Sequence, residues 1–238
     1  MLSFTRKSVF TLLAVLAASA IAVSGCGKKE AADPAAKATA PQAATASAPA
    51  EEQSAMPVPS NEPITEERTY FDFESDLNGW EVPMWAEGKS DYVARGAVVS
   101  REVASKGTGS MKVQSEFPGG KWTASLVEIQ MYLNLAKYRV VSADLYIPAE
   151  APIGLKAKLI ITVGDTWKFV EMANSVPLIP GEWVTVTASI EPGSYDWKRV
   201  VPDEDFAKDV RKIAIRVESN NKPTYTGPIY IDNIRVGR

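Results

Sequence analysis

The chain has 238 residues, with 26 Lys and Arg against 29 Asp and Glu, and it contains no histidine and one cysteine. Its formal net charge of −3 lacks the basic surplus of a nucleic-acid-binding protein. Without histidine, Ser-His-Asp and Cys-His catalysis and histidine-based metal sites are excluded, and one cysteine cannot form an internal disulfide. The sequence also contains no phosphate-binding loop and no dinucleotide-binding fingerprint.

Residues 1–25 have the features of an export signal. Arg6 and Lys7 precede an apolar run from Val9 to Val23, which is too short and too rich in alanine to predict a membrane span. The run ends in Val23-Ser24-Gly25-Cys26, which resembles the lipobox of bacterial lipoproteins. An ordinary secretory signal or an N-terminal membrane anchor is the alternative interpretation.

The lipobox resemblance implies that cleavage leaves Cys26 at the N-terminus, carrying a diacylglycerol thioether and an amide-linked acyl chain such as palmitate. Several acyl chains anchor a protein firmly, because each buried methylene contributes about 0.8 kcal/mol. Gly27 follows the cysteine, with no aspartate next to it; in a Gram-negative bacterium this favours sorting to the outer membrane. We therefore expect a lipid-anchored protein of the bacterial cell envelope.

Residues 26–64 predict a disordered linker. Small and polar residues dominate it, and no aromatic residue occurs between Cys26 and Tyr70. Such a segment cannot bury enough apolar surface to offset the loss of backbone entropy on folding. Pro34, Pro41 and Pro49 interrupt any helix that the alanines would favour. We expect a spacer that holds the following domain roughly tens of ångströms from the membrane.

Residues 65–238 are long enough for one domain, and their pattern predicts β-strands. The strands are predicted at residues 70–74, 79–84, 93–103, 110–117, 121–133, 140–147, 155–163, 167–172, 184–190, 212–217 and 229–236. Several of them alternate apolar and polar residues, which is typical of half-buried strands, although Ile160 falls where a polar residue is expected. Gly, Pro and Asn punctuate the strands, and one short helix is predicted at Asp203–Lys208. The pattern predicts an all-β, antiparallel β-sandwich.

Three motifs connect this domain with a known family. It begins Phe71-Asp72-Phe73-Glu74 and Gly79-Trp80, continues with Gly107-Thr108-Gly109-Ser110-Met111-Lys112-Val113, and closes with Tyr230-Ile231-Asp232-Asn233-Ile234-Arg235-Val236. In this order they resemble the jelly-roll carbohydrate-binding modules of the galactose-binding-domain-like superfamily, which include modules attached to mannanases. The resemblance covers most of residues 69–238. It implies a jelly roll that binds β-linked polysaccharide without catalysis, although many proteins of this fold bind no sugar.

The resemblance also implies a structural calcium ion where the first strand, the loop at Gly107 and the last strand meet. Calcium takes six to eight oxygen ligands. Asp72 and Glu74 would provide carboxylates from one face of the first strand, and the loop would provide carbonyls. Asp232 would provide a third carboxylate from among apolar neighbours, where an unpartnered charge is costly. The alternative is that Asp72 and Glu74 are solvated and that Asp232 caps a neighbouring loop.

The polysaccharide or oligosaccharide site is predicted from aromatic residues, because sugar rings stack their apolar C–H faces on electron-rich rings. From approximate position in the resembled modules, the tryptophans assigned to the concave face are Trp85, Trp122 and Trp167. The polar residues near them are Glu128, Gln130, Lys168 and Glu171. Glu128 and Gln130 are assigned to the site, since both lie an even number of residues from Trp122 and would share its side of a strand. The alternative is a solvated polar face without a ligand.

Two other functions remain open from the sequence. An envelope structural or assembly lipoprotein would use the domain to contact a protein partner, with its exposed aromatics forming an interface patch. A glycoside hydrolase would need two carboxylates about 5–10 Å apart, and Glu128 and Glu171 are the pair that the predicted strands could provide.

Overall fold

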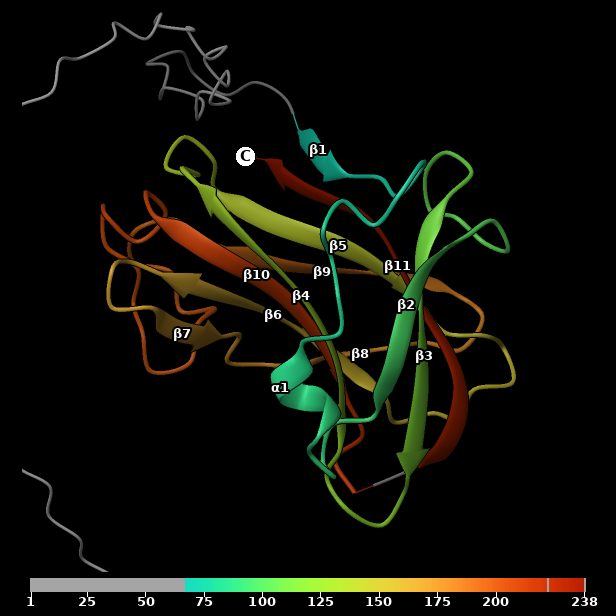
Figure 1. The fold of residues 1–238 in the computed structure, drawn as a ribbon. Coiled ribbons are helices and arrows are strands. Elements are labelled where there is room, and N and C mark those ends of the chain that lie inside the picture. Colours follow the sequence, from blue (N-terminus) through green and yellow to red (C-terminus); the bar gives the residue numbers. More distant parts are fainter. Residues whose placement is uncertain (1–66, 222, 238) are drawn as a thin grey trace, which may run out of the picture. The chain divides into compact units, whose positions relative to one another are not determined.

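The computed structural model describes residues 67–221 and 223–237 (Figure 1). The expected signal segment at residues 1–25, the lipidation site Cys26 and the linker at residues 26–64 lie outside the described residues. Within the described ranges, no helix is long and apolar enough to cross a membrane.

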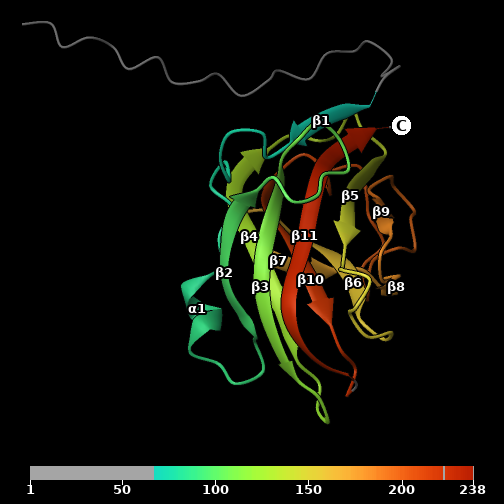
Figure 2. The ribbon, with the colours of Figure 1, turned by 90° about the vertical axis from the view of Figure 1, so that its right-hand side faces the viewer.

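The first sheet has six antiparallel strands in the order β2-β3-β11-β5-β9, with β1 also paired to β11. These strands are β1 (Arg68–Phe71), β2 (Ala94–Ser100), β3 (Ser110–Pro118), β5 (Val140–Tyr146), β9 (Trp183–Ser189) and β11 (Thr224–Gly237). Figure 2 shows this sheet nearer to the viewer, with the second sheet behind it.

The second sheet has five strands in the order β4-β10-β6-β7, with β8 also paired to β6. These strands are β4 (Ala124–Leu133), β6 (Lys156–Val163), β7 (Lys168–Glu171), β8 (Val176–Pro177) and β10 (Val210–Glu218). The predicted antiparallel β-sandwich is confirmed.

The core lies between the two sheets because the inward positions of their strands are apolar. The first sheet contributes mainly Met111, Val113, Val141, Leu145, Val186, Ile229 and Ile231, and the second mainly Val127, Leu159, Ile161, Ile213 and Ile215. Phe71, Phe73 and Trp80 pack together within this core, with the Phe71 and Trp80 ring centroids 5.6 Å apart and nearly perpendicular.

A bulge in β11 allows the isoleucines on both sides of it to face the core. Asn233 has φ +48°, and the pairing of β11 with β5 shifts register between Asp232 and Arg235. Such a bulge changes which side of the sheet the next residue faces. Ile231 and Ile234 can therefore both point into the core, while Asp232 turns to the outer side of the first sheet.

Three predicted elements are wrong or too long. The strand predicted at residues 79–84 is absent except for one bridge from Glu81 to Glu128; Pro83 instead precedes a short helix, α1 (Met84–Glu87), and proline cannot donate to a ladder. The helix predicted at Asp203–Lys208 forms turns only, in which Phe206 N–H donates to the Asp203 carbonyl and Lys208 N–H to the Asp205 carbonyl. The first strand ends at Phe71, since Phe73 has φ +52°.

Candidate functional site

The outer face of the second sheet is lined by the even-numbered residues of β4, β6 and β10 and the odd-numbered residues of β7. We call it the open face; it comprises Leu126, Glu128, Gln130, Tyr132, Lys158, Ile160, Thr162, Phe169, Glu171, Lys212, Ala214 and Arg216. Strand pairing sets these side chains in rows, one of which runs Glu128, Ala214, Ile160, Glu171 and the next Gln130, Lys212, Thr162, Phe169.

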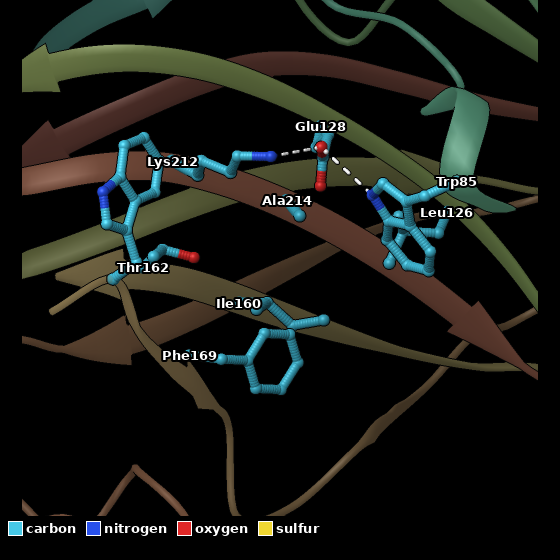
Figure 3. Close-up of a pocket in the computed structure, with 9 residues that line it drawn as sticks. Trp85, Leu126, Glu128, Ile160, Thr162, Phe169, Lys212 and Ala214 are labelled. Atoms are coloured by element: carbon cyan, nitrogen blue, oxygen red, sulfur yellow. Dashed lines mark hydrogen bonds and ion pairs between the residues drawn. The ribbon is translucent and has the colours of Figure 1, made fainter. Parts of the chain in front are cut away.

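A pocket of about 260 Å³ lies on the open face. Its lining residues are Trp85, Leu126, Glu128, Ile160, Thr162, Trp167, Phe169, Lys212 and Ala214. Leu126, Ile160 and Ala214 form a small apolar cluster that is separate from the main core. Figure 3 shows Ala214 and Ile160 between Glu128 and Phe169, and Leu126 beside Trp85. The floor of the pocket is therefore apolar.

One wall of the pocket is built from the segment between β1 and β2. Trp85, on α1, is 44% exposed, and its ring meets Tyr92 edge to face at a centroid distance of 5.0 Å. Tyr92 in turn packs on the apolar cluster, and its burial raises the pKa of its hydroxyl. The Lys89 ammonium lies 4.7 Å from the Trp85 ring centroid. These contacts hold Trp85 in place while much of its ring stays accessible.

The opposite wall is formed by Trp167 and Phe169, which are 39% and 59% exposed. The Trp167 ring meets Tyr132 nearly perpendicularly at 6.3 Å, and the Arg211 guanidinium carbon lies 5.4 Å from its centroid. Trp167 has φ +54°, a left-handed conformation that is costly for a bulky residue. Strain of this kind gathers at functional positions, and here it presents an indole ring to the pocket.

Glu128 and Lys212 provide an acceptor and a donor beside the apolar floor. The Lys212 ammonium lies 2.6 Å from Glu128 Oε1, and Trp85 Nε1 donates to the same oxygen at 3.4 Å (Figure 3). The Glu128 side chain is only 12% exposed, so this carboxylate needs the charge of Lys212. The pair fixes the direction of the polar atoms that a hydroxyl-bearing ligand would meet.

A second ionic group lies at the far end of the same row. Glu171 accepts from Lys198 Nζ at 2.6 Å and from Arg216 Nη2 at 2.5 Å. Burial raises the pKa of Glu171, but the two cations lower it by more, so the net shift is downward. The charged carboxylate of Glu171 therefore links Lys198, in the loop after β9, to Arg216 on β10.

The sequence of residues 71–233 matches the family described as mannanase, galactose-binding domain-like. The chain belongs to this family. Residues 71–233 span nearly the whole of the described sandwich, and they include both walls and the floor of the pocket.

Two solved structures resemble this galactose-binding-like domain in fold. One is the CBM27-1 module of Caldicellulosiruptor saccharolyticus in complex with mannohexaose, with 19% identity over 72% of this chain and 97% of that chain and a TM-score of 0.51. The other is a CBM28 module specific for non-crystalline cellulose, with 14% identity over 74% of this chain and 97% of that chain and a TM-score of 0.51. Comparison with curated proteins gives no match.

Three of the five predicted ligand residues of this galactose-binding-like domain line the pocket: Trp85, Glu128 and Trp167. Trp122 does not line it; its half-buried ring packs against Tyr92 at 6.3 Å and lies 5.7 Å from the Arg216 guanidinium carbon. Gln130 is exposed on the open face beside Lys212 but outside the pocket lining.

Sequence reasoning missed the floor and part of both walls. Ile160 interrupted the alternation of its strand, and the structure gives the reason, because Ile160 faces outward as part of the pocket floor. Tyr92 and Phe169 carried no comparable signal, because their roles depend on which distant residues pack beside them.

Glu128 and Glu171, the pair considered for glycoside hydrolysis, stand at opposite ends of one row, with Ala214 and Ile160 between them. Three strand spacings separate their backbones by about 14 Å, with part of the pocket floor between them. Each carboxylate is also ion-paired within the domain.

Two of the three carboxylates expected to bind calcium, Asp232 and Glu74, contact residues 105–109. Asp232 is fully buried and accepts from the N–H groups of Ser105, Lys106 and Asn233 at 2.6–3.0 Å. Burial raises the pKa of Asp232 by more than these hydrogen bonds lower it. Asp232 thus caps a neighbouring loop, as the alternative interpretation of the sequence holds.

Glu74 and Asp72 do not join Asp232 in a common site. Glu74 accepts from the N–H groups of Thr108 and Gly109, and Asp72 is exposed and accepts from the N–H of Glu74 at 3.3 Å. Across the described residues, no three acidic side chains come together in a geometry that could hold a metal ion. Because the oxygens of Glu74 and Asp232 face N–H donors, the residues present do not fit the expected calcium ion.

Proposed function

We propose that this domain binds polysaccharide without catalysis in the pocket on the open face. The observation that carries the proposal is the pair of exposed aromatic walls, Trp85 on one side and Trp167 with Phe169 on the other, above an apolar floor. Sugar rings present apolar faces to such rings and hydroxyl groups to such polar edges. Glu128 and Lys212 stand where those hydroxyl groups would be bound.

The distance between the walls supports a chain ligand over a single sugar. Trp85 contacts Glu128 and Trp167 contacts Tyr132, and these two residues are four positions apart on β4. Four residues of a strand span about 14 Å, which exceeds the width of one sugar ring. The family and the mannohexaose complex of a similar fold make β-linked mannan the first ligand to test.

The proposal includes a membrane anchor. Lipidation of Cys26 would fix the protein to a bacterial envelope membrane, and residues 26–64 would place the pocket away from the surface. A module held in this way would capture polysaccharide at the cell surface without cleaving it.

The test is affinity electrophoresis of the purified full-length chain in gels containing mannan, mixed-linkage glucan, xylan, xyloglucan or peptidoglycan fragments. Retardation by one polysaccharide class, lost in Trp85→Ala and Trp167→Ala but kept in Trp183→Ala, is the expected result. Trp183 is the matched control because it packs against Tyr146 on the other sheet. Equal mobility in every gel, from a folded sample, would contradict the proposal and favour a protein-binding envelope lipoprotein.

A further inference from the structure

Residues 101–109 connect β2 to β3 and fold over the outer side of the first sheet. The Ser105 hydroxyl donates to Asp144 on β5 at 2.6 Å, and the Ser105 N–H donates to Asp232 on β11 at 2.7 Å. Asp144 also accepts from Arg235 at 2.8 Å, and its hydrogen bonds lower its pKa although burial raises it. One end of this loop is thus held by buried carboxylates whose donors are all within the protein.

The other end of the loop is held by Glu74. The Thr108 N–H donates to Glu74 Oε1 at 2.7 Å, the Gly109 N–H donates to the same oxygen at 3.0 Å, and the Thr108 hydroxyl donates to Oε2 at 2.7 Å. The backbone N–H bonds, that of Thr108 first, lower the pKa of Glu74 to about 2. Both carboxylate oxygens of Glu74 are thus turned toward the loop.

Arg101 places a cation beside this carboxylate from within the same loop. Its guanidinium donates to the Glu74 carboxylate at 3.2 Å, to the main-chain carbonyl of Glu74 and to the hydroxyl of Thr108. Carboxylate, carbonyl and hydroxyl oxygens are the ligand types that calcium takes in proteins. The guanidinium is always charged and presents several N–H groups in a fixed plane, so it can satisfy several such oxygens together.

The backbone leaves no space between Glu74 and the loop. A Cβ atom at Gly107, where φ is +71°, would lie 2.1 Å from Glu74 Oε1, and a Cβ at Gly109 would lie 2.3 Å from the Phe73 carbonyl oxygen. The two glycines thus allow the loop backbone to approach Glu74 directly. This approach brings the N–H groups of Thr108 and Gly109 to the Glu74 carboxylate. It does not arrange the loop carbonyls around a calcium ion.

We infer that the side chain of Arg101 is the internal cation of this site, and that the loop at residues 101–109 is held without a metal ion. The function of the site is then to order the loop over β5 and β11 by means of Glu74 and Asp232. This inference does not depend on whether the open face binds polysaccharide.

The test is thermal unfolding of the full-length chain after EDTA treatment and after addition of excess calcium. Wild type is expected to give the same Tm in both, while Arg101→Met lowers Tm by about 2–5 °C and Arg101→Lys recovers part of this loss. Hydrogen exchange of the Thr108 and Gly109 amides should quicken in Arg101→Met, because their acceptor is no longer held in place.

Arg95→Met is the matched control, since Arg95 pairs with Glu116 at 2.8 Å on exposed strand positions. Its Tm should change by less than about 1 °C, as for most exposed ion pairs. A wild-type Tm that falls with EDTA and returns with calcium would overturn the inference without any use of the variants. Equal effects of Arg101→Met and Arg95→Met would also overturn it.

Discussion

The open face and the side of the first sheet under residues 101–109 both carry carboxylates, but their surroundings are satisfied in different ways. Under the loop, Asp232 takes three backbone N–H groups and Glu74 takes two more together with Arg101. On the open face, Trp85, Trp167 and Phe169 remain exposed around an apolar floor. The first arrangement is complete within the chain, whereas the second presents groups that a ligand can cover.

This difference implies that substitutions under the loop change stability, whereas substitutions on the open face change ligand affinity. Both sides belong to one sandwich, so the same folded sample can report both quantities.

The largest expected effect is on stability, in Asp232→Ala. Three N–H groups would lose their buried acceptor, which should cost about 3–5 kcal/mol and lower Tm by about 6–20 °C. Asp232→Asn should cost less, because its amide oxygen can still accept. Thermal unfolding followed by circular dichroism measures both changes.

Asp72→Ala is the control for this prediction, because Asp72 is exposed. Its Tm should stay close to that of wild type. A loss of stability in Asp72→Ala as large as in Asp232→Ala would instead indicate that the two carboxylates act on one shared ion.

The next effect is on affinity, in Trp85→Ala and Trp167→Ala. Each removes one exposed wall of the pocket and should weaken binding of a retarding polysaccharide by about 10- to 30-fold. Isothermal titration with a soluble oligosaccharide gives the affinity, and the Tm should remain near that of wild type. Unchanged affinity in both variants would contradict the proposal that the open face binds polysaccharide.

A smaller effect concerns backbone strain at Trp167, which should change stability without changing ligand affinity. Trp167→Gly should be more stable than Trp167→Ala by roughly 1 kcal/mol, or about 2–4 °C in Tm, since glycine adopts the observed left-handed conformation freely. Both variants should lose the same affinity. If glycine and alanine gave equal Tm values, the backbone at this position would not be strained.

The smallest effect is a pH dependence that comes from Glu74. Its pKa is lowered from 4.5 to about 2 in the folded chain, so its ionised form stabilises the fold fully above about pH 4.5 and this contribution is lost as the pH falls toward 2. The difference in Tm between wild type and Glu74→Gln should therefore shrink over this range. A difference that stays constant with pH would contradict the assigned hydrogen bonds.

The sequence predicts the strands well where one face of each is buried. The alternation at residues 184–190 and 212–217 places the inward positions correctly, because burial of one face enforces a period of two. The strand prediction fails between residues 79 and 93. There Pro83 precedes a helix, and single bridges from Glu81 and Tyr92 to β4 replace a continuous strand pairing. The bulge at Asn233 also has no reliable local signal.

The candidate site was predictable only in part. Trp85, Glu128 and Trp167 could be chosen because their residue types suit a sugar and their strand positions suit the outer face. Tyr92 and Phe169 could not, since an aromatic residue near a strand is equally compatible with the core. The partners of Glu74 and Asp232 depend on how the loop at residues 101–109 closes, which no spacing in the chain specifies.

The most direct measurement of the central claim uses the indole N–H signals of the six tryptophans in a two-dimensional ¹⁵N-¹H NMR spectrum. Titration with mannohexaose, or with an oligosaccharide of whichever polysaccharide retards the chain, should shift the Trp85 and Trp167 signals. The signals of Trp80 and Trp197, which are buried, and of Trp183, on the other sheet, should stay in place. Movement of Trp183 while Trp85 and Trp167 stay fixed would contradict the claim that the open face binds polysaccharide.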